Sequence, residues 1–251
     1  MSTKTKKVHY ISKMGQKHHK SKSSLGRIWH FIWEDDSPLS WIVNIILAFV
    51  LIKFVVYPGL GWILGTSHPV VAVVSGSMEH RITYETHLNN PSNSCSGLKK
   101  GDLNICGIVF EEKRSMDLDQ YWETCGSWYL TANVTKSEFA SFPLKNGFNR
   151  GDIIVLRNKK PEDIKTGDVI IFQTSVIADP IIHRVVKIKD KNSERVFQTK
   201  GDHNAGSGGI DMDIKQDDII GVAWVRIPYL GYIKIWATEA LNSIKCLLRG
   251  G

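Results

Sequence analysis

The sequence has few cysteines, and no two of them have the Cys-x-x-Cys spacing that is typical of structural zinc sites. Four cysteines occur in 251 residues, and Cys95, Cys106 and Cys125 fall in the middle of the chain. An odd group of three allows one disulfide and one remaining thiol, and spacing does not choose the pair. We therefore expect no zinc site, and the sequence assigns no metal or cofactor.

The chain also lacks a basic face on its folded part. Its net charge is +7, from 32 Lys and Arg against 25 Asp and Glu. Residues 1–36 hold eight of the basic residues and three of the acidic ones, so +5 of this excess belongs to an N-terminal tail. A nucleic-acid-binding domain would instead gather its basic residues on one surface. We expect no nucleic-acid partner.

One long hydrophobic run is present, at residues 41–64. At ~1.5 Å per residue, a helix of this length crosses the ~30 Å hydrocarbon core of a bilayer. Its strongly polar side chains are Asn44 and Lys53, and a mid-span lysine costs on the order of 3 kcal/mol unless it snorkels or finds a partner. Basic residues precede the run and none follows it immediately. We expect a retained single-pass anchor in the cell membrane, with a cytoplasmic N-terminus and the rest of the chain extracytoplasmic.

Beyond this run, helices and strands do not alternate, which argues against a doubly wound fold. Turns rich in Gly, Asn and Asp instead separate six short β-branched runs, at residues 69–74, 152–156, 168–172, 181–186, 195–199 and 219–225. We predict a mainly β fold class: an antiparallel β-sandwich or barrel-like catalytic domain preceded by a single transmembrane helix.

The predicted organisation has four parts: a basic cytoplasmic tail (1–40), a transmembrane signal anchor (41–64), an extracytoplasmic β domain (65–231) and a C-terminal amphipathic segment (232–251). Within the β domain, residues 81–148 show weaker periodicity and are interpreted as an insertion. They contain an N-glycosylation sequon at Asn133. The charges of Lys234, Glu239 and Lys245 make the last segment a poor second span, so we expect it to lie on the membrane or on the domain.

Two hydroxyls, those of Ser75 and Ser77, directly follow the first predicted strand in the segment VVSGSMEH. A serine is a weak nucleophile without a base in hydrogen-bond reach, and alone these residues would be ordinary turn formers. His183 interrupts an apolar run, an unusual place for an imidazole without assigned partners. Asp202 lies in a glycine-containing turn further on, and Asp211 follows it. Serine, histidine and aspartate at the strand ends of one β domain are the components of an acyl-transfer site.

Five blocks in a fixed order make this pattern specific: SGSME, GDIIV, HRVV, TKGDHN and IIGVAWVRIPYLG. Together they resemble the type I signal peptidases over most of residues 41–236. Bacterial members have a lysine base where this chain has His183, which is similar to the archaeal and endoplasmic-reticulum type. The resemblance implies a membrane-bound serine endopeptidase that removes N-terminal signal peptides from secretory preproteins, cleaving after small residues at the membrane surface.

The same resemblance implies a role for each candidate residue. Ser77 attacks the scissile carbonyl, and His183 takes up the proton and returns it to the leaving amine. Asp202 orients His183, and Asp211 is the second acid. Asp213 is an alternative second acid, because the interval after the first acid is longer here than is usual in the family.

The oxyanion hole implied by the resemblance consists of the Ser77 backbone N–H and the Ser75 hydroxyl. His80 stands where the family often has proline. We rank His80 and His203 below His183 as the base, because neither lies in the HRVV block.

The expected partners are signal-peptide-bearing preproteins, the lipid bilayer and accessory subunits. Ser77 follows the hydrophobic run by 13 residues, which is at most ~45 Å of extended chain and keeps it close to the bilayer. By resemblance the substrate binds as an extended strand, and residues 70–74 and 168–172 are the candidate edges. The main alternative is a membrane-anchored, non-enzymatic binding or adhesin-like β ectodomain. A repressor-type Ser-Lys autoprotease would need a lysine base and no anchor.

Overall fold

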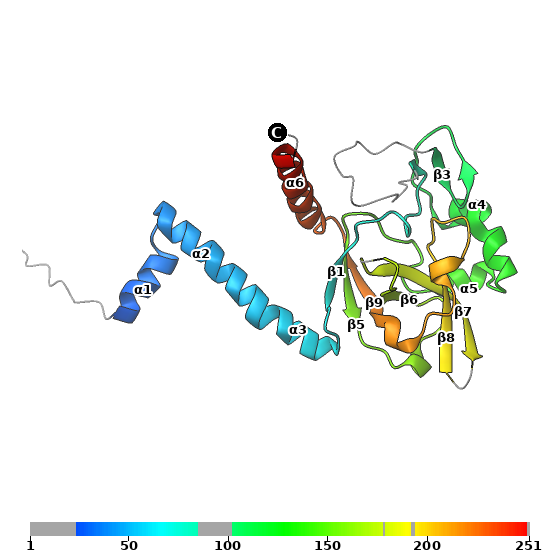
Figure 1. The fold of residues 1–251 in the computed structure, drawn as a ribbon, viewed down its shortest axis with the longest axis horizontal. Helices are drawn as coiled ribbons and strands as arrows, with labels where there is room; N and C mark the ends of the chain where they lie inside the picture. Colours follow the sequence, from blue (N-terminus) through cyan, green and yellow to red (C-terminus); the bar gives the residue numbers. More distant parts are fainter. Residues whose placement is uncertain (1–23, 85–101, 178, 192–193, 250–251) are drawn as a thin grey trace, which may run out of the picture. The chain divides into compact units, whose positions relative to one another are not determined.

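The computed structural model describes residues 24–84, 102–177, 179–191 and 194–249 (Figure 1). The chain divides into two compact units between Val55 and Val56. Most of the expected cytoplasmic tail lies outside the described residues, as does Cys95.

The N-terminal unit contains the helices α1 (Ser24–Trp33) and α2 (Pro38–Leu51). Both polar residues of the hydrophobic run have partners within this unit. The Asn44 side chain donates to the carbonyl of Ile32 at 2.8 Å, and the Lys53 ammonium lies 5.5 Å from the ring centroid of Phe54. These contacts lower the cost of placing a polar group in an apolar environment.

In the part of the chain that the structure describes, one helix is long and apolar enough to cross a membrane. It comprises the 27 residues Pro38–Leu64, with a mean hydropathy of 2.5. It includes α2, a π-helical turn η1 (Ile52–Val56) and α3 (Tyr57–Leu64), and it ends at Gly65 with a φ of 66°. Its large apolar side chains are mostly exposed, so they require a lipid or protein environment.

The second unit is built on an antiparallel sheet in the order β1-β5-β9-β6-β7-β8. Its six strands coincide with the six predicted runs: β1 (Val70–Ala72), β5 (Ile153–Arg157), β6 (Val169–Phe172), β7 (Ile181–Lys191), β8 (Glu194–Lys200) and β9 (Ile219–Ile227). Within the described ranges, β1 and β8 each pair with one neighbour in this sheet, so it is not a closed barrel. The prediction of a mainly β, antiparallel fold preceded by one apolar helix is confirmed.

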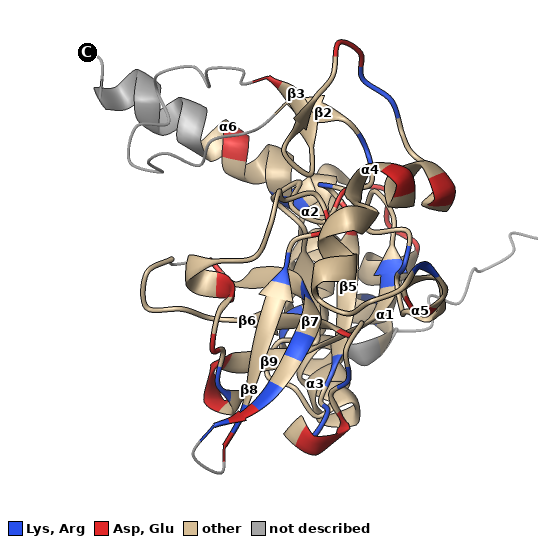
Figure 2. Cartoon of the chain, turned by 90° about the vertical axis from the view of Figure 1, so that its right-hand side faces the viewer, with Lys and Arg blue, Asp and Glu red and all other residues tan. Residues whose placement is uncertain are grey.

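Strand β6 is buried on both faces. Val169 and Ile171 pack into one hydrophobic cluster, and Ile170 and Phe172 into another, because successive strand residues point to opposite faces. Strand β6 has no charged residue. In contrast, charged residues of both signs lie where β7 ends and β8 begins (Figure 2). The backbone of β6 pairs with β7 on one side and β9 on the other. The expectation that residues 168–172 form a substrate-binding edge is therefore wrong.

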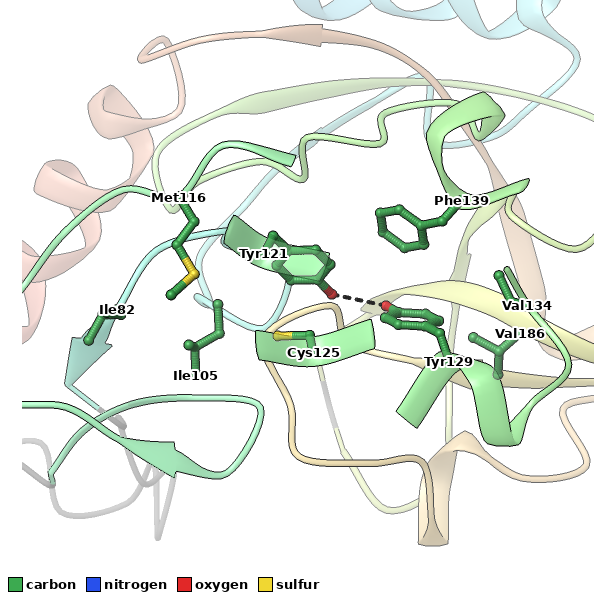
Figure 3. Close-up of a cluster of buried hydrophobic side chains, with 9 residues drawn as sticks. All are labelled: Ile82, Ile105, Met116, Tyr121, Cys125, Tyr129, Val134, Phe139 and Val186. Carbon is green, nitrogen blue, oxygen red and sulfur yellow. Dashed lines mark hydrogen bonds between the residues drawn. The ribbon is translucent and has the colours of Figure 1, made fainter. Parts of the chain in front are cut away.

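The expected insertion forms a second layer on the β domain. It contains a small sheet of β2 (Thr83–Tyr84), β3 (Leu103–Ile105) and β4 (Ile108–Val109), and the helices α4 (Leu118–Thr131) and α5 (Lys136–Ser141). Each helix begins with a capping box, formed by Asp117 with Gln120 and by Thr135 with Glu138. Val186 of β7 packs into the same hydrophobic cluster as these helices (Figure 3).

Short helical turns and one long helix complete the second unit. The turns are η3 (Pro161–Asp163), η4 (Gly209–Asp211) and η5 (Gln216–Asp218), and the long helix is α6 (Tyr232–Arg249). The start of α6 is held to the sheet by a hydrogen bond of 2.8 Å from the Gly231 N–H to the Gly151 carbonyl. Arg150 and Glu239 form an ion pair of 2.8 Å between the same two parts.

A disulfide joins Cys106 to Cys125, and so links the turn between β3 and β4 to helix α4. The two cysteines are 19 residues apart in the sequence. This is one of the pairings that the sequence left open.

We expect the double variant Cys106→Ala/Cys125→Ala to unfold more easily than the wild type, by about 3 kcal/mol, because a cross-link of this loop length restricts the unfolded chain. Thermal unfolding of the detergent-solubilised protein, followed by circular dichroism, measures the difference. Reductant should lower the stability of the wild type and leave the double variant unchanged. Equal stability of the two proteins under oxidising conditions would contradict the expectation.

Candidate active site

The two serine hydroxyls lie in a tight turn that follows β1. The turn is closed by a hydrogen bond of 3.0 Å from the Glu79 N–H to the Gly76 carbonyl. Ser75 Oγ and Ser77 Oγ are 3.2 Å apart, within hydrogen-bond distance, and both residues are half-buried. The next residue, Met78, is fully buried. The segment is therefore anchored in the core, while Ser75 and Ser77 themselves are partly exposed.

His183 is held by a buried carboxylate. Its Nδ1 lies 2.5 Å from Asp211 Oδ1, and the same oxygen accepts a hydrogen bond of 2.6 Å from Thr199 Oγ1. All three side chains are buried. The ring orientation is thus fixed through one nitrogen, and the other nitrogen, Nε2, is left for a second partner.

The turn after β8 brings His183 and the Ser77 segment to the same small space. A Cβ on Gly201 would lie 2.8 Å from His183 Nε2 and 2.8 Å from the Ser77 carbonyl oxygen, so only glycine fits at this close approach. The His203 N–H also donates to the Ser77 carbonyl, at 2.9 Å. Among the described contacts no hydrogen bond joins Ser77 Oγ to His183. In unliganded sites such contacts often form only when substrate binds.

Among the described hydrogen bonds none joins the Asp202 carboxylate to His183, and the carboxylate has other partners. Its carboxylate accepts from Arg184 Nε at 2.9 Å and Nη2 at 2.7 Å, from His80 Nε2 at 2.9 Å and from the Tyr129 hydroxyl at 3.0 Å. Because Arg184 follows His183 along β7, the two side chains point to opposite faces of the strand. Asp211, which we expected as the second acid, thus occupies the position on His183 that we expected for Asp202.

The charge states of Asp202 and His80 follow from their burial and their contacts. Burial by itself favours the neutral acid, but the Arg184 guanidinium and the His80 hydrogen bond outweigh it and hold the pKa of Asp202 well below its usual range. Burial lowers the pKa of His80, against the opposing effect of Asp202. At neutral pH, Asp202 is therefore ionised, and His80 is a neutral imidazole that donates through Nε2.

The Lys200 side chain binds the backbone of the turn that contains Gly201 and Asp202. Its ammonium is fully buried and donates to the carbonyls of Gly201 at 3.0 Å and Asp202 at 3.2 Å. It also faces the rings of Trp128 and Tyr129, with centroids 5.3 Å and 5.0 Å away. Burial lowers the pKa of Lys200 to about 8.

This pKa predicts a stability change in alkaline solution. In the unfolded chain Lys200 keeps its proton up to its ordinary pKa, 10.5, so between about pH 8 and 10 the unfolded state binds more protons than the folded state. The free energy of unfolding therefore rises with pH in this window. We expect the wild type to gain about 2 kcal/mol relative to Lys200→Met between pH 8 and 10. Denaturant unfolding at both pH values measures this, and parallel behaviour of the two proteins would contradict it.

The remaining candidates have partners other than His183 among the described contacts. Asp213 is exposed and pairs with Lys191 at 3.2 Å. His203 Nδ1 lies 3.4 Å from the Glu79 carbonyl. Neither residue takes the position that Asp211 occupies.

Several side chains that contact His183, Asp211 or Asp202 were not identified from the sequence. Arg184 and Thr199 lie inside the HRVV and TKGDHN blocks, where a charged residue in a buried run was a usable signal for a buried ion pair. Tyr121 and Tyr129 lie on α4, and the capping box at Asp117 is a local signal that could have indicated the start of that helix. No local signal connects these tyrosines to Asp202.

Comparison with known proteins gives partial matches to catalytic subunits of signal peptidase complexes, and no family model matches the chain. The chain is 36% identical over 107 residues to the signal peptidase complex catalytic subunit SEC11 of Lachancea thermotolerans, covering 38% of this chain and 61% of that protein. The SEC11 subunit of Eremothecium gossypii is 37% identical over 103 residues, with the same two shares, 38% and 61%. The SEC11C subunit of Homo sapiens is 32% identical over 98 residues, covering 37% of this chain and 51% of that protein.

The matched region thus spans less than two thirds of each of these relatives. All three are named as catalytic subunits of a signal peptidase complex. These similarities confirm the resemblance of this chain to signal peptidases of the endoplasmic-reticulum type.

Proposed function

We propose that this chain is a membrane-bound serine endopeptidase that removes N-terminal signal peptides from secretory preproteins. The observation that carries the proposal is the buried His183–Asp211 pair, whose free imidazole nitrogen faces the Ser77 segment across Gly201. The similarity to catalytic subunits of signal peptidase complexes supports the same activity. A non-enzymatic ectodomain is not favoured, because it gives no reason for this arrangement.

We propose one role for each residue of the reaction. With Nδ1–H donated to Asp211, His183 Nε2 accepts the proton of Ser77 as Oγ attacks the scissile carbonyl carbon. The imidazolium then protonates the leaving amine, and the carbonyl–nitrogen bond breaks to give an acyl-enzyme. Water, deprotonated by the same imidazole, hydrolyses the ester and restores Ser77. Asp211 stabilises the imidazolium, and Thr199 fixes Asp211.

The Ser75 hydroxyl is the proposed side-chain donor to the oxyanion. In the resting structure it lies 3.2 Å from Ser77 Oγ, so it is already beside the reacting oxygen. Together with the Ser77 backbone N–H it would stabilise the negative charge that develops during attack, and one such donor contributes roughly 3 kcal/mol to the transition state.

Strand β1 is the proposed docking edge for the substrate. Among the described residues its backbone pairs with β5 alone, so its other side is available to an extended peptide. The strand leads directly into the turn with Ser75 and Ser77, which would place a peptide bond next to the nucleophile. The apolar helix Pro38–Leu64 ends shortly before β1 in the chain, and we propose that it keeps this site at the membrane surface.

Variants of the three catalytic residues test the mechanism. We expect Ser77→Ala, His183→Ala and Asp211→Asn each to slow preprotein cleavage at least about 1000-fold, since the three act as a unit. The matched control is Asp213→Asn, which removes a nearby exposed carboxylate and should cleave normally. The assay is cleavage of a preprotein by the solubilised chain with any proteins that co-purify. Wild-type cleavage by a correctly folded Ser77→Ala variant would exclude the mechanism.

We also propose that the chain works with accessory subunits, because the relatives are named as subunits of a complex.

The proposed topology places the second unit on the side of the membrane opposite the cytoplasm. The sequon residue Asn133 is exposed between α4 and α5. In a eukaryotic host we expect an endoglycosidase-sensitive glycan that disappears in Asn133→Gln. Lys22→Asn, which creates a sequon in the N-terminal tail, should add no glycan. A glycan on the tail together with an unmodified Asn133 would reverse the proposed orientation.

A further inference from the structure

Two tyrosines of the inserted segment reach the buried Asp202 from helix α4. The Tyr129 hydroxyl donates to the Asp202 carboxylate at 3.0 Å, and the Tyr121 hydroxyl donates to the Asp202 carbonyl at 2.8 Å. The two hydroxyls lie 3.1 Å apart (Figure 3). Both tyrosines have no exposed surface. The side chain and the backbone of Asp202 are therefore both held by the insertion.

His80 connects the serine segment to the same group. Its Nε2 lies 2.9 Å from Asp202 Oδ2, and its ring stacks on Tyr121 with centroids 3.6 Å apart and an interplanar angle of 1°. The His80 carbonyl accepts a hydrogen bond of 2.9 Å from the Met116 N–H, just before α4. His80 is thus held by the insertion through its ring and through its backbone, three residues after Ser77.

Asp202 is the neighbour of Gly201, the turn residue that lies close to both His183 and the Ser77 segment. A Cβ on Gly201 would lie 2.8 Å from both His183 Nε2 and the Ser77 carbonyl oxygen, and Asp202 itself is bound by Arg184, the neighbour of His183 on β7. A rotation of Asp202 would therefore move the Gly201 turn relative to both. A misplacement of about 1 Å between reacting groups can lower a rate roughly 100-fold.

Simple core filling does not account for the tyrosine hydroxyls. Phenylalanine would fill the same space without burying a polar group, which is costly unless it is hydrogen-bonded. Both hydroxyls end on atoms of Asp202, and a fully satisfied buried network of this kind fixes one geometry. Phe139 lies in the same aromatic cluster, with its ring 4.8 Å from that of Tyr129, but it offers no hydrogen bond. A variant of Phe139 therefore changes the packing of the cluster without removing a hydrogen bond to Asp202.

We propose that Tyr121, Tyr129 and His80 are positioning residues, through which the inserted segment holds Asp202 and aligns Ser77 with His183. This inference rests on the proposed function. The three residues act through Asp202 and do not touch the substrate, so they set kcat and leave KM unchanged.

The test compares kcat and KM for preprotein cleavage by full-length variants, at a temperature where each is folded. Tyr129→Phe, Tyr121→Phe and His80→Phe should lower kcat about tenfold or more with KM unchanged. His80→Gln keeps a donor near the position of Nε2 and should recover much of the rate. Phe139→Leu is the matched control: it should lower the unfolding temperature, because it leaves space in the cluster, and keep kcat.

The outcomes separate this inference from the proposed function. Wild-type kcat in Tyr129→Phe and His80→Phe would overturn it, as would a loss of rate that follows unfolding temperature across all variants, Phe139→Leu included. A change confined to KM would also overturn it, since it would assign the cluster to substrate binding. Normal cleavage by Ser77→Ala would instead remove the proposed function itself.

Discussion

The buried ion pair between Arg184 and Asp202 is the interaction on which the rest of the site depends. All five N–H donors of the guanidinium are used: two bind the Asp202 carboxylate, and the others bind the carbonyls of Pro143, Leu144 and Gly167. Burying two charges carries a large desolvation penalty, which only such complete pairing offsets. Removing one partner of a pair like this typically costs about 3–5 kcal/mol. The pair therefore ties β7, the turn after β8 and the end of the insertion into one arrangement.

This pair also explains why two nearby aspartates have separate roles. Strand β7 presents His183 on one face and Arg184 on the other, so each face needs its own carboxylate. Asp211 reaches His183 from the turn η4, with Thr199 beside it. Asp202 reaches Arg184 from the turn after β8. A single aspartate in the turn after β8 could not bind both His183 and Arg184, because their side chains point to opposite faces of β7.

Much of the architecture could be predicted from local pattern. The β-branched runs indicated all six strands of the main sheet, and the HRVV and SGSME blocks contain the proposed base and the proposed nucleophile. The order of strands could not be predicted, because it depends on pairing between distant segments. For this reason β6 was interpreted as an edge although it lies between β7 and β9. The choice of Asp211 over Asp202 as the partner of His183 likewise depends on how two turns fold back in space.

The helices of the inserted segment were harder to predict from the sequence. Its apolar residues pack into an aromatic cluster and do not form a regular apolar stripe along α4. Its buried tyrosines, Tyr121 and Tyr129, are polar at the tip, so the usual distinction between apolar and polar helix faces is blurred. Likewise, spacing alone could not pair Cys106 with Cys125, since three cysteines allow several pairings.

His80 shows how the insertion and the serine turn depend on each other. The type I signal peptidases that this chain resembles often have proline at this position. Its fixed φ stiffens the chain after the proposed nucleophile. Here a histidine stands instead, and its rigidity comes from tertiary contacts, namely the stack on Tyr121 and the hydrogen bond to Asp202. A buried neutral imidazole without these contacts would be destabilising. Without His80, in turn, Tyr121 would lose the closer of two stacked rings, the other being that of Phe139. The serine turn of this chain is therefore stiffened by the folded insertion rather than by its local sequence.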